Sequence, residues 1–210
     1  MKNSRVILSI AVGLFSLVSG LAGEWTFNPQ TGRLRHDESG CTKLERMVLP
    51  DAVTQIGSGL FNACTNLRSV SLPPYLDRIE GSAFDGCSAL GEIDIPDGPE
   101  FIDSCTFRDC TSLRRIRLPD TLTQLDPNAF LNCPSLRTIS LPKNLQRASF
   151  QLLRQCPGLD SFSVAEANPD FKAIDGVLFS KGQNFGVLIF FHGQKRSADR
   201  WTPCVFCSDP

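Results

Sequence analysis

The stretch LRRIRLPDTLTQLDPNAFLNCPS, residues 113–135, is one unit of a pattern that returns every 23 residues along the chain. The interval of 23 residues is kept without insertion or deletion by six cysteines, Cys41, Cys64, Cys87, Cys110, Cys133 and Cys156. Each unit begins at a leucine, which gives five full repeats and the start of a sixth, at Leu44, Leu67, Leu90, Leu113, Leu136 and Leu159. A fixed period of this kind predicts a stacked repeat architecture.

Each unit predicts one short strand at positions 3 to 6, counted from its leucine. Positions 4 and 6 are apolar in every unit, as Ile116 and Leu118 illustrate, whereas positions 3 and 5 are mostly polar, as in Arg115 and Arg117. Alternation with a period of two is typical of a strand with one buried and one exposed face. Proline occupies position 7 in five units and ends the strand, because it has no backbone donor.

Two further apolar columns indicate that each unit turns back on itself. Position 13 is apolar in four successive units, at Ile56, Ile79, Ile102 and Leu125. Position 18 is aromatic at Phe61, Phe84, Phe107 and Phe130, and Leu153 replaces the aromatic in the fifth unit. One unit alone would have nothing to bury these side chains against, so stability must come from stacking at roughly 4.8 Å. The expected fold is a repeat solenoid with a phenylalanine spine.

The unit at 113–135 resembles the 23-residue leucine-rich repeat of the BspA-like, or treponemal-type, family of cell-surface proteins, and the resemblance covers about residues 41–180. The segment 168–179 also resembles a hairpin insertion that is common between repeats in that family, and its Asp-Gly step is a hairpin signal on its own account. The resemblance implies a right-handed coil of short parallel β-strands with a mostly irregular or short helical convex side. The shared residues are core and turn positions, with no site among them.

The N-terminus carries the pattern of a secretory signal peptide. Lys2 and Arg5 precede an apolar run from Val6 to Val18, which is followed by small residues up to a predicted cleavage after Ala22. An uncleaved membrane anchor is the alternative, but the apolar run is short for a membrane span. We therefore expect a secreted protein or one held at the cell surface or envelope, with no integral membrane span after cleavage.

The expected organisation has five parts. Residues 1–22 form the signal peptide, 23–43 an N-terminal lead-in or cap, 44–165 the repeats, 166–191 a hairpin insertion with a partial repeat, and 192–210 an atypical tail. The tail has no leucine column and no proline stop. We interpret it as disordered, or as the result of truncation of a longer repeat protein or of a reading-frame shift after about residue 182.

Nine cysteines in an exported chain would ordinarily invite disulfides, and stacked coils at roughly 5 Å would allow them. A column that points into the core also suits small buried thiols. The prediction is a ladder of unpaired thiols, with disulfides between coils as the alternative. Cys105 stands off the ladder and is expected near the surface. Cys204 and Cys207 form an isolated C-x-x-C with only His192 nearby, too few ligands for zinc, and without the strand-helix-strand context of a redox site. We interpret them as incidental cysteines of the tail, with a metal or thiol function of the tail as the alternative.

Catalytic and cofactor patterns do not emerge from the sequence. Its only histidines are His36 and His192, no serine stands in a nucleophile elbow, and there is no phosphate-binding glycine loop. We therefore expect no enzyme, metal or cofactor. The net charge of −1 gives no electrostatic reason to expect nucleic acid or an anionic membrane as partner.

The exposed side of the predicted sheet is the candidate binding surface, because solenoids use such extended faces to bind macromolecules. Its candidate ligand-binding residues are Arg46, Glu92, Asp94, Arg115, Arg117 and Arg137. The simpler interpretation is a ladder of exposed ion pairs. The functional interpretation is a recognition patch for an extended acidic or glycosylated partner.

The family resemblance implies adhesion through the repeat sheet face. Its partners would be protein or glycoprotein ligands, such as host extracellular matrix proteins, or other cells. The alternative is a structural role, in which these repeats space or dock onto other repeats of a larger cell-envelope protein.

Overall fold

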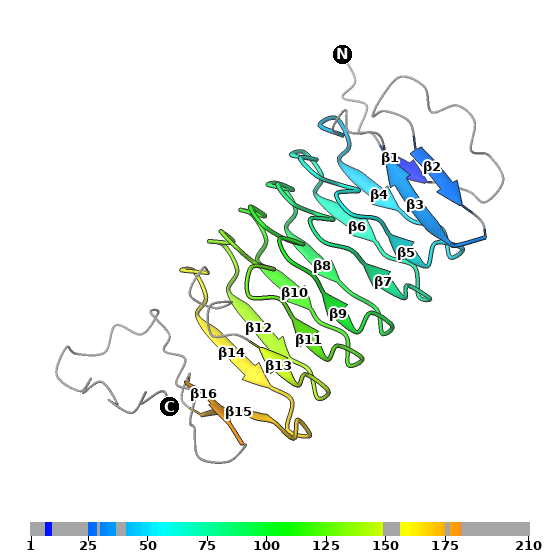
Figure 1. The fold of residues 1–210 in the computed structure, drawn as a ribbon. Helices are drawn as coiled ribbons and strands as arrows, with labels where there is room; N and C mark the ends of the chain where they lie inside the picture. Colours follow the sequence, from blue (N-terminus) through cyan, green and yellow to red (C-terminus); the bar gives the residue numbers. More distant parts are fainter. Residues whose placement is uncertain are drawn as a thin grey trace, which may run out of the picture.

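The structure is a computed structural model that describes residues 7–9, 25–28, 30–36, 41–148, 156–174 and 177–181. It is a parallel β-solenoid of about five turns, and the described residues contain no helix (Figure 1). This confirms the predicted repeat solenoid. No helix in the described part of the chain is long and apolar enough to cross a bilayer.

The predicted strand of each repeat contributes to a front sheet. Its strands are β4 (Arg46–Val48), β6 (Ser69–Ser71), β8 (Glu92–Asp94), β10 (Arg115–Arg117), β12 (Thr138–Leu141) and β14 (Ser161–Val164). Neighbouring strands are parallel and pair residues 23 apart, such as Arg115 with Glu92. The pairing is interrupted between β6 and β8, which belong to different sheets. The front sheet therefore consists of two sections.

An additional strand, β1 (Ile7–Ser9), pairs in parallel with β4 at the N-terminal edge of the front sheet. It lies inside the predicted signal peptide. The predicted cleavage position after Ala22 lies outside the described residues, as do the tail at 192–210 and the C-x-x-C motif. Those predictions remain untested.

A second sheet runs along the other side of the coils. Its strands are β2 (Trp25–Asn28), β3 (Arg33–His36), β5 (Gln55–Ile56), β7 (Arg78–Ile79), β9 (Phe101–Ile102), β11 (Gln124–Leu125) and β13 (Arg147–Ala148). The sequence reveals the apolar column at position 13 but not these strands, because two residues are too few to show alternation. The antiparallel hairpin β2–β3 extends this sheet at the N-terminal end, where the sequence predicts a cap.

Turns form the third side of each coil, and their backbones are bonded from coil to coil. The amide of Phe84 donates to the carbonyl of Thr106 at 2.9 Å, and the amide of Phe107 donates to Ala129 at 2.8 Å. A left-handed backbone recurs at position 20, with φ between 56° and 73° at Ala63, Gly86, Asp109 and Asn132. The turns thus satisfy buried polar groups of the backbone without a helix.

The phenylalanine spine is confirmed. The rings of Phe61, Phe84, Phe107 and Phe130 stack with successive centroids 5.1, 5.3 and 5.5 Å apart and interplanar angles of 13° or less. All four side chains are at most 1% exposed. A further buried column, which the sequence analysis did not identify, lies at position 10 and contains Val53, Leu76, Leu122 and Leu145. Leu153 lies outside the described residues.

The cysteine ladder follows the spine and differs from the prediction at one point. Cys41 and Cys64 are joined by a disulfide, with their Cα atoms 4.7 Å apart, so the prediction of unpaired thiols is wrong there. The spacing that aligns the columns also brings two sulfur atoms into reach, and the period cannot decide whether they bond. The later rungs, Cys87, Cys110, Cys133 and Cys156, remain thiols.

Each later thiol donates a hydrogen bond to a backbone carbonyl. The Sγ–H of Cys87 donates to the carbonyl of Phe61 at 3.1 Å, and Cys110, Cys133 and Cys156 repeat this contact with the phenylalanine 26 residues earlier, at 3.1 to 3.6 Å. Burial raises the pKa of all four thiols, that of Cys133 to about 12. These thiols are therefore protonated and unreactive at neutral pH.

A β-hairpin follows the repeats, at the place where the sequence predicts a hairpin insertion. It consists of β15 (Phe171–Ile174) and β16 (Val177–Ser180), which pair antiparallel. Asn168 holds it to the last coils, since its fully buried amide donates to the carbonyls of Pro142 and Leu145. The Oδ1 atom of Asn168 accepts the amides of Asp170 and Phe171, both at 2.8 Å. Both donors and both acceptor positions of this buried side chain are therefore satisfied.

Candidate protein-binding face

The outward side chains of the front sheet form one polar surface, which we call the front-sheet face. Apolar residues at position 4 point into the core, which leaves positions 3 and 5 in solvent. The front-sheet face consists of Arg46, Val48, Ser69, Ser71, Glu92, Asp94, Arg115, Arg117, Thr138, Ser140, Ser161 and Ser163. Backbone hydrogen bonds and the stacked interior hold the strands in place, so the surface is a rigid template.

Three of the predicted ligand-binding residues are paired with one another. Arg115 Nε lies 3.5 Å from Glu92 Oε2, and Arg115 Nη2 lies 3.3 Å from Asp94 Oδ1 on the neighbouring strand. All three side chains are more than half exposed. Pairs in this environment contribute at most about 1 kcal/mol each, so a ligand could exchange them at little cost.

Arg117 and Arg46 differ from Arg115, because neither forms an ion pair within the described part of the chain. Arg117 lies beside Arg115 on β10, where its strand partner is Asp94. Arg46 lies on β4, two coils before β8, and the ladder of strand pairs is interrupted between β6 and β8. The other five predicted residues lie on or directly beside the section formed by β8, β10, β12 and β14.

Arg137 is exposed but does not belong to a strand of the front sheet. Its Nη1 atom donates to the carbonyl of Gly158 at 3.1 Å and lies 3.7 Å from Asp160 Oδ2. These contacts tie two adjacent coils together just before β12. The structure thus gives Arg137 a bridging position at the edge of the predicted patch.

A shallow hollow of about 770 Å³ lies over β10, β12 and β14 on the same face. Its polar lining combines the two arginines of β10 with four hydroxyl groups, from Arg115, Arg117, Thr138, Ser140, Ser161 and Ser163. Asp120 also lines the hollow, and its carboxylate is paired with Lys143 at 3.3 Å. The hydroxyl of Ser163 donates to that of Ser140 at 3.0 Å. This combination provides donors that could orient carboxylate, amide or sugar oxygens.

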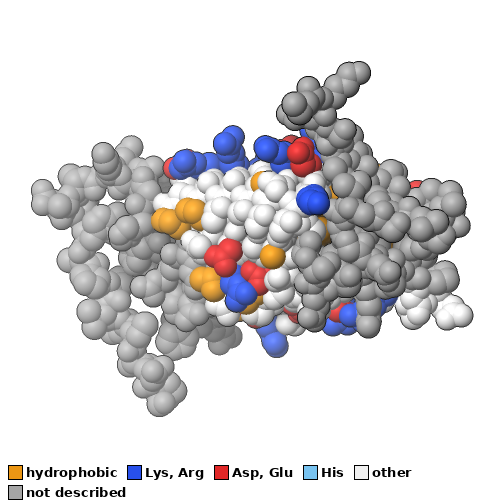
Figure 2. Space-filling view, turned by 90° about the horizontal axis from the view of Figure 1, so that it is seen from above, with side chains coloured by type: hydrophobic (Ala, Val, Ile, Leu, Met, Phe, Trp, Pro, Cys, Tyr) orange, Lys and Arg blue, Asp and Glu red, His pale blue; other side chains and the backbone are white. Residues whose placement is uncertain are grey.

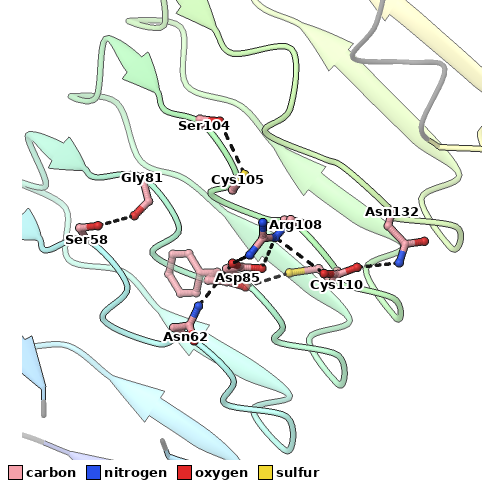
Figure 3. Close-up of polar contacts among 11 residues, drawn as sticks. Ser58, Asn62, Gly81, Asp85, Ser104, Cys105, Arg108, Cys110 and Asn132 are labelled. Carbon is pink, nitrogen blue, oxygen red and sulfur yellow. Dashed lines mark hydrogen bonds and ion pairs between the residues drawn. The ribbon is translucent and has the colours of Figure 1, made fainter. Parts of the chain in front are cut away.

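A second polar row lies on the turn side and was not identified from the sequence (Figure 3). Arg108 binds Asp85 through two nitrogens, with Nε 2.9 Å from Oδ1, and Asn62 donates to the other oxygen at 3.3 Å. The hydrogen bond to Asp85 raises the pKa of the Arg108 guanidinium. A repeat alignment contains the signal, because Asn62, Asp85 and Arg108 share position 19. Since the Asp85 side chain is only 5% exposed, this row is structural.

The described residues were also searched for a group of side chains that could bind a metal ion. No group of three or more histidine, cysteine, aspartate or glutamate side chains there could hold a metal ion. Cys105 is half-buried, as expected for a cysteine off the ladder, and its sulfur lies 3.6 Å from Ser104 Oγ. On the described part of the face drawn in Figure 2, backbone and uncharged, non-hydrophobic side chains predominate, with separate small groups of hydrophobic and of charged side chains.

Several solved structures resemble this chain, among them the following three. A Treponema pallidum leucine-rich repeat protein is 29% identical, with a TM-score of 0.58 over 67% of this chain and 68% of its own. The pneumococcal vaccine antigen PcpA is 27% identical, with a TM-score of 0.60 over 66% of this chain and 35% of its own. A leucine-rich cell surface protein from Faecalibacterium prausnitzii A2-165 is also 27% identical, with a TM-score of 0.54 over 69% of this chain and 44% of its own.

No curated protein matches the chain. The model of the BspA type leucine-rich repeat region matches residues 39–184 in six copies. This match spans the front sheet, the phenylalanine spine and the C-terminal hairpin, the same elements that the 23-residue period predicts. The chain therefore belongs to the BspA-type leucine-rich repeat family.

Proposed function

We propose that this chain is an exported, surface-exposed binding protein that holds protein or glycoprotein partners on its front-sheet face. The section formed by β8, β10, β12 and β14 supports the proposal most strongly. It offers an arginine without an ion pair, a second arginine in weak exposed pairs, and a row of hydroxyls around one hollow. Because the coils fix the strands, little ordering entropy would be lost on binding.

Surface location is supported by the predicted signal peptide and by relatives described as a cell surface protein and a vaccine antigen. Leucine-rich repeat domains generally mediate protein–protein interaction, and this family is typically non-enzymatic. We propose an adhesin-like role toward extracellular matrix proteins or other cells. Contact would be made by Arg115 and Arg117, whose charges suit acidic or glycosylated ligands.

The test is surface fractionation of producing cells, followed by pull-down of a panel of matrix proteins and glycoproteins with the purified chain. The double variant Arg115→Glu with Arg117→Glu reverses both charges of β10. It should lower the affinity for the bound partner tenfold or more, because like charges would then face an acidic ligand. Melting should fall by only about 2–4 °C, because both side chains are exposed and the new glutamates meet Glu92 and Asp94 in water.

Arg78→Glu is the matched control, since Arg78 is an exposed arginine of the second sheet. It should leave binding unchanged. Unaltered affinity of the Arg115 and Arg117 double variant for a verified partner would refute the role of this face.

A structural role is the second candidate. The chain covers only 35% of PcpA and 44% of the Faecalibacterium protein, so repeats of this type also occur in longer chains. In that role the repeats would space or dock onto others of a larger envelope protein. Coding sequence for further 23-residue repeats downstream would favour this role over adhesion.

A further inference from the structure

The third repeat exposes an aromatic side chain where the other repeats carry polar ones. Position 12 of each unit lies on the outer side of the second sheet and holds Gln55, Arg78, Phe101, Gln124 and Arg147. Phe101 is 46% exposed. Its neighbour Ile102 fills the core column, so the fold does not require an aromatic at Phe101.

A hollow of about 510 Å³ lies beside this ring, and we call it the Phe101 hollow. Its apolar wall includes Phe101, Leu125, Pro127 and Phe171, the last from β15 of the hairpin. Ile102 and Ile93 both point into the core, so the second sheet and the front sheet expose opposite sides of the coil. Strands β9 and β11 form a different row from β8, β10 and β12 (Figure 1). The Phe101 hollow is therefore separate from the front-sheet face.

Two carboxylates line the same hollow without a basic partner. Asp103 and Asp126 each follow a strand of the second sheet by one residue, on adjacent coils, and neither forms an ion pair in the described part of the chain. Asp126 Oδ1 accepts the amide of Asn128 at 2.8 Å. Among the described residues of the lining, Arg147 from β13 is the one basic side chain. The end of the hollow near β9 and β11 is thus acidic.

An exposed aromatic ring beside a concave apolar wall is the usual anchor of a protein interface, and unpaired carboxylates select a cation next to it. We propose that the Phe101 hollow binds a peptide segment of a partner protein in which a large apolar side chain stands next to lysine or arginine. The apolar side chain packs on Phe101, and the cation lies against Asp103 and Asp126. The molecule then has two binding surfaces on opposite sides of its core.

The test is a peptide array probed with the purified chain in the form recovered from its producing cells. The array holds eight-residue peptides with a central phenylalanine or leucine flanked by lysines, by glutamates or by serines, and serine-centred peptides flanked by lysines. Peptides with an apolar centre and lysine flanks should bind at least tenfold more tightly than the other classes. Phe101→Gln, which installs the residue of Gln55 and Gln124, should remove that binding.

Two further variants separate the apolar and the charged contributions. Asp103→Asn with Asp126→Asn should abolish the preference for lysine over serine flanks while retaining the apolar preference. Tyr75→Thr, which alters a 73% exposed aromatic elsewhere, should bind like the parent. Folding of each variant is checked by its urea midpoint.

The proposal is overturned if glutamate-flanked peptides bind as tightly as lysine-flanked ones in a chain that also carries Arg115→Glu and Arg117→Glu, which removes the basic side chains of the front-sheet face. It is overturned as well if well-folded Phe101→Gln binds like the parent. It is also overturned if the array shows no peptide class above background. A parent chain that dimerises in light scattering, with Phe101→Gln monomeric, would assign the hollow to self-association and likewise exclude the peptide ligand.

Discussion

The phenylalanine spine and the front-sheet face follow the same 23-residue period but differ in how strictly they keep their residues. The spine holds phenylalanine in four successive coils, whereas positions 3 and 5 of the face change among serine, acid and arginine from strand to strand. A spine residue is enclosed by the same column of the coils on both sides, so only one shape fits. A face residue meets water. In a solenoid, variation within an exposed column therefore marks positions that the fold leaves available for binding.

The strongest test of this comparison replaces one phenylalanine of the spine and one exposed phenylalanine of the surface. Phe107→Ala should cost about 3–5 kcal/mol of unfolding free energy, because it leaves a cavity between two stacked rings. Phe101→Ala should cost less than about 1 kcal/mol, since the ring is 46% exposed. Urea denaturation of both variants measures the difference. Equal losses would show that Phe101 belongs to the core and not to a surface.

The next largest effect concerns the buried amide that attaches the C-terminal hairpin. Asn168→Ala removes four hydrogen bonds and leaves the carbonyls of Pro142 and Leu145 without these donors, so we expect a loss of about 2–3 kcal/mol. Asn144→Ala is the matched control, because that exposed side chain makes one bond, to the carbonyl of Asp120 at 2.7 Å. It should cost less than about 1 kcal/mol. A similar loss in both would contradict the anchoring role of Asn168.

The cysteine ladder predicts how stability changes in alkali. Burial raises the pKa of Cys133 to about 12, whereas an unfolded thiol ionises near 8.5. Above pH 9 the unfolded state therefore loses a proton that the folded state keeps, and stability falls by about 1.4 kcal/mol per pH unit for each such thiol.

Urea titrations between pH 8.5 and 10.5 measure this slope in the parent and in Cys133→Ala. The variant should be less stable at pH 7 but should lose about 1.4 kcal/mol less per pH unit. Ala129→Gly, a buried change without a titrating group, should keep the parent slope. Parallel pH profiles for the parent and Cys133→Ala would mean that this thiol is not enclosed.

The sequence predicts those features that every coil repeats. The column that contains Phe84 and Phe107 predicts the spine, and the alternation around Ile116 predicts the front sheet. Both are predictable because every coil repeats the same packing. It does not predict features that depend on one coil or on a pair of coils. The period places Cys41 next to Cys64 but does not determine whether their sulfur atoms form a disulfide.

The same limit applies to the candidate sites. Exposure of Arg115 and Arg117 follows from the alternation of the strand, but the interruption of the strand pairs between β6 and β8 does not. Phe101 departs from its column, yet its exposure becomes evident only when the two-residue strands of the second sheet are seen. Searching the aligned repeats for the odd residue in each column would have found both Phe101 and the row at position 19.

The smallest expected effect is the difference in stability between losing an ion pair of the turn row and losing one of the front-sheet face. The Asp85 carboxylate is 5% exposed and is held by Arg108 and Asn62, whereas Glu92 is 68% exposed beside Arg115. Asp85→Asn should cost about 1 kcal/mol, a value reduced because Arg108 itself is 42% exposed and can return to water. Glu92→Gln should change stability by less than about 0.5 kcal/mol. Both losses are read from urea midpoints at low and high salt. If Glu92→Gln proved the more damaging, the front-sheet pairs would be part of the fold's stability, and a ligand could not displace them cheaply.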